Sequence, residues 1–141
     1  MAMPAWFRLF YSLLWAVLLP FAFVRIAWRG RSNRDYWQHW GERVALARPA
    51  GPFDLWIHAV SVGEARASVP LIQSFLMRGK RVLVTCTTPT GRQTLRTLLR
   101  DQVTLCYLPY DAPWLISRFL RRARPALAVL LETELWPGVC D

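Results

Sequence analysis

The sequence contains few of the residues that build metal centres and disulfide frameworks. Its 141 residues include three cysteines, Cys86, Cys106 and Cys140, with no CxxC pair, and two histidines, His39 and His58, at no ligand spacing. Each cysteine lies beside apolar residues, which favours buried thiols in a reducing compartment over a disulfide or metal role. We therefore assign no metal and no cofactor.

The chain is also poor in acidic residues and has no glycine-rich nucleotide signature. Neither a GxGxxG nor a Walker sequence is present, and nine acids stand against 18 Lys and Arg, a net charge of +9. This excess predicts an anionic partner, for which acidic lipid, a phosphorylated substrate and nucleic acid all qualify on charge. Hydrophobic residues are abundant at 54%, with eight Trp, which excludes a disordered tail and suggests contact with lipid.

An apolar run occupies the N-terminal part of the chain. From Leu9 to Val24 sixteen residues carry no charge, with Arg8 before them and four arginines after them, Arg25, Arg29, Arg31 and Arg34. As a helix this run is about 24 Å long, short of the roughly 30 Å hydrocarbon core. It fits either a short spanning helix or a helix partly inserted in one leaflet. The arginine excess after the run predicts that the rest of the chain stays cytoplasmic.

From Phe53 onward, short apolar runs alternate with segments of helical spacing. Strands are predicted at 53–60, 81–86, 103–108 and 126–132, and helices at 64–78, after Thr90 and at 114–122. This alternation predicts an α/β fold with a parallel sheet flanked by helices. We expect a membrane anchor over residues 1–30, a connector with a short helix around 34–42 over residues 31–52, and one Rossmann-like domain over residues 53–141.

The loop after the first strand places Glu64 at the start of a helix. Ser61-x-x-Glu64 fits a capping box, in which Ser61 caps the amide of residue 64 and the carboxylate turns back to the Ser61 amide. Ligands in parallel sheets bind beyond the carboxyl ends of the strands, where the same carboxylate has the chemistry of a general base. Spacing alone leaves both roles open. His58 is better explained as a packed core histidine.

The loop after the second strand has the composition of an anion site. Thr87 or Thr88 is the expected N-cap, Pro89 is the first helical residue, and the first turn contains Thr90, Gly91 and Arg92. Free amides, hydroxyls and the positive helix end suit phosphate or carboxylate. Ordinary capping explains the same residues.

The remaining two loops carry carboxylates. Asp111, after the third strand, occupies the expected N-cap position of the next helix, with ligand binding as the alternative role. Glu132 and Glu134 follow the last strand directly, where a charge is costly unless it has a partner or a function.

Four motifs together resemble the 3-deoxy-D-manno-octulosonic acid (Kdo) transferase family. They are WIHAVSVGEARAS (Trp56–Ser68), VTCTTPTGRQ (Val84–Gln93), YLPYDAPW (Tyr107–Trp114) and ETELWP (Glu132–Pro137), and the Trp40-Gly41-Glu42-Arg43 step after the anchor is also similar. The resemblance implies the N-terminal half of an inverting glycosyltransferase of GT-B architecture. In that family the N-terminal domain binds the lipid acceptor and a C-terminal domain binds the CMP-Kdo donor.

The resemblance also implies roles for individual residues. Glu64 aligns with the family's catalytic base, and Glu132 with its second acidic residue. The implied substrate-binding residues are Ser61, Gly63, Thr88, Thr90, Gly91 and Arg92. The implied partners are CMP-Kdo, the lipid A precursor and the inner membrane at its cytoplasmic face, with no nucleic acid. We expect this chain alone to be inactive; a non-catalytic module that binds acidic lipid is the competing interpretation.

Overall fold

Alternating apolar strands and amphipathic helices fold into a parallel sheet covered on both faces. The structure, a computed structural model, describes residues 4–32, 37–47 and 49–131. Its elements, in chain order, are α1 (Ala5–Ser32), α2 (Trp40–Arg43), β1 (Phe53–Ala59), α3 (Val62–Leu76), β2 (Val82–Cys86), α4 (Pro89–Leu99), a 3-10 turn (Arg100–Gln102), β3 (Thr104–Tyr107), α5 (Pro113–Ala123) and β4 (Pro125–Leu131).

The four strands are parallel in the order β3-β2-β1-β4. Leu55 of β1 pairs with Val82 of β2 on one side and with Leu127 of β4 on the other. Every residue of β2 and all but one of β1 are buried, as expected for central strands covered on both faces. The carboxyl ends of these strands, with the loops that follow them, therefore meet at one edge of the sheet.

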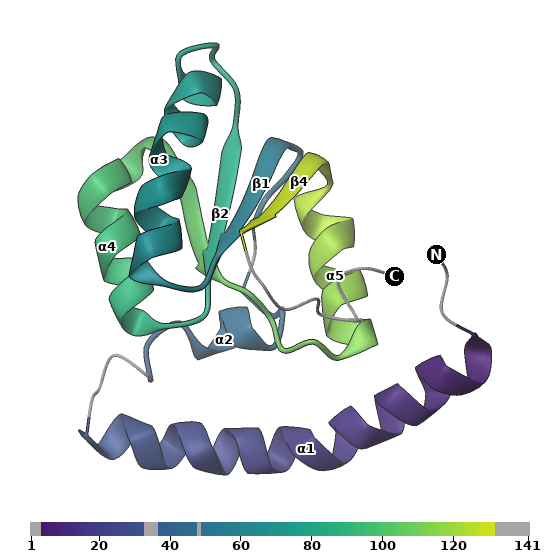
Figure 1. Ribbon diagram of the computed structural model, residues 1–141. Coiled ribbons are helices and arrows are strands. Elements are labelled where there is room, and N and C mark those ends of the chain that lie inside the picture. The colour runs from purple at the N-terminus through teal and green to yellow at the C-terminus, as the bar shows by residue number, and fades with distance from the viewer. Residues whose placement is uncertain (1–3, 33–36, 48, 132–141) are drawn as a thin grey trace.

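Helices cover the two faces of the sheet separately (Figure 1). On one face Leu55 and Ile57 of β1 pack in a cluster with Ile72 of α3 and Leu95 of α4. On the other face Trp56 packs against Phe119 of α5, with ring centroids 5.2 Å apart. The α/β fold predicted from the alternating pattern is confirmed, with strand and helix ends within a few residues of those expected.

Helix α1 is longer than the apolar run and lies along the domain (Figure 1). The Tyr11 hydroxyl donates a hydrogen bond to Oδ2 of Asp111 at 2.5 Å, and Phe23 packs edge-on against Trp40 at 4.9 Å between centroids.

The prediction that Asp111 caps α5 is wrong. The N-cap of α5 is Ala112, without a side-chain cap, and the Asp111 carboxylate instead receives Tyr11 from the N-terminal helix.

His58 is a buried core histidine, as predicted. Its side chain lies in β1, with Nδ1 2.8 Å from Oγ1 of Thr85, which also accepts a hydrogen bond from the Trp56 indole at 2.9 Å. Burial lowers the pKa of His58 to about 4 and outweighs the opposing effects of Thr85 and Glu64. His58 is therefore neutral at pH 7 and makes a poor general base.

This pKa predicts an acid-sensitive core. An unfolded His58 has a pKa near 6.5 and takes up a proton before the folded one does, so stability is complete above about pH 6.5 and is lost as pH falls toward 4. We expect a loss of about 3 kcal/mol in unfolding free energy over this window. Urea unfolding between pH 7 and 4 should show it, and His58→Gln should flatten that part of the profile. An unchanged slope in His58→Gln would contradict the assignment.

Candidate functional site

The loop between β1 and α3 holds Glu64 in a reciprocal capping box. Oγ of Ser61 accepts a hydrogen bond from the Glu64 amide at 3.1 Å, and Oε2 of Glu64 accepts from the amides of Ser61 at 3.2 Å and Val60 at 2.7 Å. The capping role expected from Ser61-x-x-Glu64 is thus confirmed. The box also fixes the carboxylate at the carboxyl end of β1.

The capping box leaves one Glu64 oxygen available. Only Oε2 takes part in the hydrogen bonds above, and Oε1 accepts none from the described residues. Partial burial acts to raise the pKa of Glu64, but hydrogen bonds from Val60 and Ser61 outweigh it and hold the pKa below its ordinary value. Glu64 is therefore an ionised carboxylate with a free oxygen, so capping and proton acceptance are compatible.

Gly63 leaves the surface beside this carboxylate open. A Cβ at Gly63 would meet only Oγ of Ser61, at 3.8 Å, among the described residues. Glycine in a helix costs about 1 kcal/mol relative to alanine, and no close packing within the described part of the chain requires it here. The open space next to Glu64 is consistent with the approach of another molecule.

The N-terminus of α4 adjoins the Glu64 loop. Thr88 is the N-cap, and its Oγ1 accepts from the Gly91 amide at 3.1 Å. Gly91 is buried, and a Cβ there would lie 3.0 Å from Thr88 Oγ1 and 3.4 Å from the Val60 carbonyl. Glycine thus lets the start of α4 approach the end of β1, which brings the two predicted loops together.

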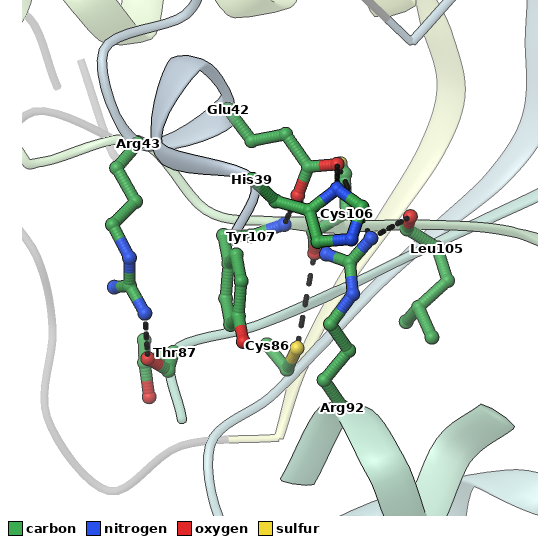
Figure 2. Close-up of polar contacts among 9 residues, drawn as sticks. All are labelled: His39, Glu42, Arg43, Cys86, Thr87, Arg92, Leu105, Cys106 and Tyr107. Carbon is green, nitrogen blue, oxygen red and sulfur yellow. Dashed lines mark hydrogen bonds and ion pairs between the residues drawn. The ribbon is translucent and has the colours of Figure 1, made fainter. Parts of the chain in front are cut away.

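Helix α2 links the connector to this edge of the sheet (Figure 2). The Glu42 carboxylate accepts from Nη1 and Nη2 of Arg92 at 2.5 and 3.2 Å and from the Tyr107 amide at 2.8 Å. Both side chains of the Glu42–Arg92 pair are only 12% exposed. Burial acts to lower the pKa of Arg92, but its bonds to Glu42 outweigh this and raise it. The pair ties α2 to α4 and to the end of β3.

Arg43 makes a second contact between α2 and the site. Its Nη2 donates to the Thr87 carbonyl at 3.1 Å, next to the N-cap of α4. Figure 2 shows the Tyr107 ring between Arg43 and Arg92, whose guanidinium carbons lie 4.0 and 4.7 Å from the ring centroid. Burial raises the pKa of Tyr107. Glu42 and Arg43 thus hold both ends of the strip from Thr87 to Arg92.

The structure brings together most, but not all, of the predicted site residues. Ser61, Gly63 and Glu64 lie at the start of α3, and Thr88, Thr90 and Gly91 at the start of α4, where Oγ1 of Thr90 is 3.4 Å from Oγ1 of Thr88. Arg92 is engaged by Glu42, and its role in substrate binding stays a prediction. Glu132 and Glu134 lie outside the described residues, as does Cys140; Cys86 and Cys106 are buried, as expected.

Comparison with known proteins decides the family. The family described as 3-deoxy-D-manno-octulosonic-acid transferase (kdotransferase) matches residues 38–141. The chain is 37% identical over 139 residues to a 3-deoxy-D-manno-octulosonic acid transferase of Bordetella pertussis, covering 92% of this chain and 32% of that protein. Its identity to the enzyme of the same name in Haemophilus influenzae is 34%, with coverages of 94% and 32%. The chain belongs to the Kdo transferase family.

The Kdo transferase relatives are much longer than this chain. A relative of the same name in Rickettsia bellii is 35% identical, over 95% of this chain but 33% of its own length. The chain therefore spans about a third of the length of the curated relatives it matches. The resemblance seen in the four motifs is confirmed at the level of the family, and the matched segment includes α2 as well as the sheet.

Sequence reasoning missed the role of α2. The sequence pattern of Trp40-Gly41-Glu42-Arg43 indicates only a family motif within a connector, although the segment carries two opposite charges. Its partners Arg92 and Tyr107 are 50 and 65 residues away. The signal that could have pointed to this role is the pair of opposite charges, Glu42 and Arg43, close to a predicted site in a strongly basic chain. The spacing of residues in the sequence does not identify their partners.

The Glu42–Arg92 pair predicts a large stability effect. Glu42→Ala leaves the largely buried Arg92 without its counterion, which costs about 3 kcal/mol in unfolding free energy. The matched control is Lys80→Ala, which removes the exposed Lys80–Asp54 pair at 3.2 Å and should cost under about 1 kcal/mol. Urea unfolding in detergent measures both. Equal, small effects would show that the Glu42–Arg92 pair does not hold α2 to the sheet.

Proposed function

We propose that this chain is the acceptor-binding, N-terminal part of a Kdo transferase. In this proposal it takes part in transferring Kdo from CMP-Kdo to the lipid A precursor, lipid IVA, at the cytoplasmic face of the inner membrane. The domain over residues 53–141 would form the first half of a GT-B enzyme, and the donor would bind to a second half. Family membership and the geometry at Glu64 support the proposal.

The observation that carries the proposal is the fixed carboxylate at the end of β1. Glu64 is ionised, is held by two backbone amides, and retains Oε1 beside the open surface at Gly63. A base needs a defined position within hydrogen-bond reach of the proton it removes, and the capping box supplies that position. The adjacent α4 N-terminus offers a positive helix end to an anionic group.

The chemistry assigned to Glu64 balances without a cofactor. A hydroxyl oxygen of the acceptor forms a bond to the anomeric carbon of Kdo as the bond from that carbon to CMP breaks. The hydroxyl proton passes to Glu64 in the same step, because a carboxylate with a pKa below its ordinary range cannot deprotonate an alcohol beforehand. CMP departs with the electron pair of the broken bond.

Glu132 is proposed to support the transition state. The last described residue of β4, Leu131, pairs with Ala59 at the end of β1. The chain thus leaves β4 next to the strand that leads to Glu64, and a second carboxylate near this point would stabilise positive charge on the sugar ring.

We further propose that α1 lies in the plane of one leaflet. The segment Trp6–Arg31 is long and apolar enough to cross a membrane. However, Tyr11 contacts Asp111 of the domain and Phe23 contacts Trp40 of α2, which Glu42 ties to the domain, although Tyr11 and Phe23 are about 18 Å apart along the helix. A helix standing across the bilayer would have to give up one of these contacts or pull the charged domain into the hydrocarbon.

The exposed side chains of α1 support the in-plane orientation. Eight large apolar residues of α1 are each at least 60% exposed and fall within about 120° of the helix circumference: Trp6, Leu9, Phe10, Leu13, Val17, Phe21, Val24 and Trp28. This membrane stripe lies opposite the face with Tyr11 and Trp15, which contacts the domain. One apolar face toward lipid and one face against a polar domain is the pattern of an interfacial helix.

Spin labels measure this orientation directly. Labels at Phe10→Cys, Val17→Cys and Val24→Cys, in the chain reconstituted in vesicles, should report similar shallow depths of about 5–10 Å. A spanning helix would instead separate the first and last label by about 21 Å in depth. A label at Gln73→Cys, an exposed position of α3, is the aqueous control. Graded depths across the three stripe positions would contradict the in-plane orientation.

Glu64→Gln separates the base from the cap. The substitution belongs in a chimera of this chain with the remaining two thirds of the Bordetella pertussis relative, assayed for Kdo transfer to lipid IVA. Glutamine keeps the capping acceptor but cannot take the proton, so turnover should fall about 10²–10⁴-fold with little change in melting temperature. Ser74→Ala, which removes a hydroxyl of α3 that donates an exposed hydrogen bond to the Leu71 carbonyl outside the site, is the control and should leave turnover nearly unchanged. Near-normal turnover in Glu64→Gln would leave Glu64 a structural residue; no turnover in the parent chimera, with lipid IVA still bound, would favour a non-catalytic lipid-binding module.

A further inference from the structure

A groove of about 520 Å³ lies between α1 and the loop that precedes α4. Its volume is within the range of small-molecule sites in proteins. One wall comes from α1, through Leu18, Phe21, Ala22 and Ile26. The opposite side is formed by Arg43, Thr87, Thr88 and Tyr110, so the groove borders the candidate site at the start of α4.

The charged residues that line the groove, among those the structure describes, are all basic. They are Arg25, Arg29 and Arg43, of which Arg29 also has a further interaction within the chain. Arg43 is only 7% exposed, and its Nε has no hydrogen-bond partner among the described residues. A buried guanidinium with an unused donor is costly, and it stands beside the N-cap Thr88 of the eleven-residue helix α4. An anionic group in the groove would offset both the guanidinium charge and the positive helix end.

The apolar wall shows what else the ligand carries. Phe21 belongs both to the membrane stripe and to the groove, and it is 68% exposed. The groove is therefore continuous with the face of α1 that we place in the leaflet. A molecule can enter it sideways from the bilayer, with acyl chain against α1 and head group toward Thr88. A free phosphate would leave this wall unused.

We propose that the groove binds the acyl-chain root and a phosphate of the phosphorylated, acylated acceptor itself. The phosphate lies among Arg25, Arg29 and Arg43, and an acyl chain runs along Ala22 and Phe21 toward the leaflet. Since Gly91 brings the start of α4 next to Val60, the attached sugar is then held beside the Glu64 loop. This proposal rests on the proposed function, and it adds the place where the negative charge of the acceptor is recognised.

Lipid IVA binding to the detergent-solubilised full chain, measured by native mass spectrometry, tests the groove without turnover. Arg25→Gln/Arg29→Gln removes two of the three charges and leaves the Arg43 contacts intact; we expect binding to weaken about 10–100-fold. Ala22→Trp, which fills the groove, should weaken it comparably. The matched control is Arg8→Gln/Arg31→Gln, with the same loss of charge on α1 outside the groove lining, and it should change binding less than about threefold. Equal losses in the two double variants would overturn the proposal.

Competing ligands identify the source of the bound group. Removing the phosphates of the ligand should weaken binding as much as removing the arginines does. Dephosphorylated lipid IVA should therefore bind the parent chain with the same low affinity as lipid IVA shows for Arg25→Gln/Arg29→Gln. If phosphatidylglycerol displaces lipid IVA at equal concentration, the groove serves bulk membrane lipid and the acceptor assignment is wrong. If inorganic phosphate alone displaces it, the apolar wall has no role and the proposal also fails.

The chimera keeps this inference separate from the proposed function. If the groove binds the acceptor, Arg25→Gln/Arg29→Gln should raise KM for lipid IVA about tenfold or more while kcat changes little. If Arg25→Gln/Arg29→Gln transfers Kdo with an unchanged KM, the proposed function stands and the proposal for the groove is wrong. If lipid IVA binding depends on the groove but the parent chimera transfers no Kdo, the groove proposal stands and the proposed function is wrong.

Discussion

The buried ion pair between Glu42 and Arg92 is the contact on which the arrangement of the site depends. It joins a four-residue helix from the connector to the first turn of α4, and the same carboxylate holds the Tyr107 amide at the end of β3. Two charges removed from water are costly unless their hydrogen bonds are well formed, and here Glu42 accepts three. The connector is thus part of the edge of the sheet at which the candidate site lies. Arg43, the next residue, reaches the Thr87 carbonyl from the position that the pair defines.

From that edge, three features converge on one place. The capping box presents Glu64 with one oxygen unused, Gly91 draws the positive end of α4 against β1, and Arg43 stands beside the groove that opens toward α1. Under the proposed function these three features would serve as the base, the anion site and the hydrophobic wall that hold a phosphorylated lipid and accept the proton of its hydroxyl. A cap and a base are often treated as alternatives for such a glutamate. At Glu64 the cap uses Oε2 and the proposed base would use Oε1, so the capping box would also fix the geometry of the proposed base.

Local patterns predicted the sheet, the flanking helices and two of the caps. Ser61 with Glu64, and Thr88 with Pro89, are signatures whose partners lie within a few residues, so spacing alone was sufficient. The prediction that Asp111 caps α5 is wrong for the opposite reason, because the Asp111 carboxylate accepts a hydrogen bond from Tyr11, one hundred residues away. Glu42 and Arg92 form a long-range contact of the same kind. Pairings between distant charged residues depend on the packed fold, and neither periodicity nor propensity encodes them. The Ser61-x-x-Glu64 pattern fits both a cap and a catalytic base, so spacing alone cannot choose between these roles. The functional prediction for Glu64 therefore depends on the resemblance to Kdo transferases.

A double-mutant cycle tests most directly whether the Glu42–Arg92 pair organises this edge. Unfolding free energies of the parent chain, Glu42→Gln, Arg92→Gln and the double variant give the coupling energy between the two side chains. A pair this buried should show a coupling of about 2 kcal/mol, within the range for contacting residues in one network, and the double variant should be little worse than either single one. Additive losses, with a coupling near zero, would contradict the account, because α2 would then be held to the sheet by other contacts.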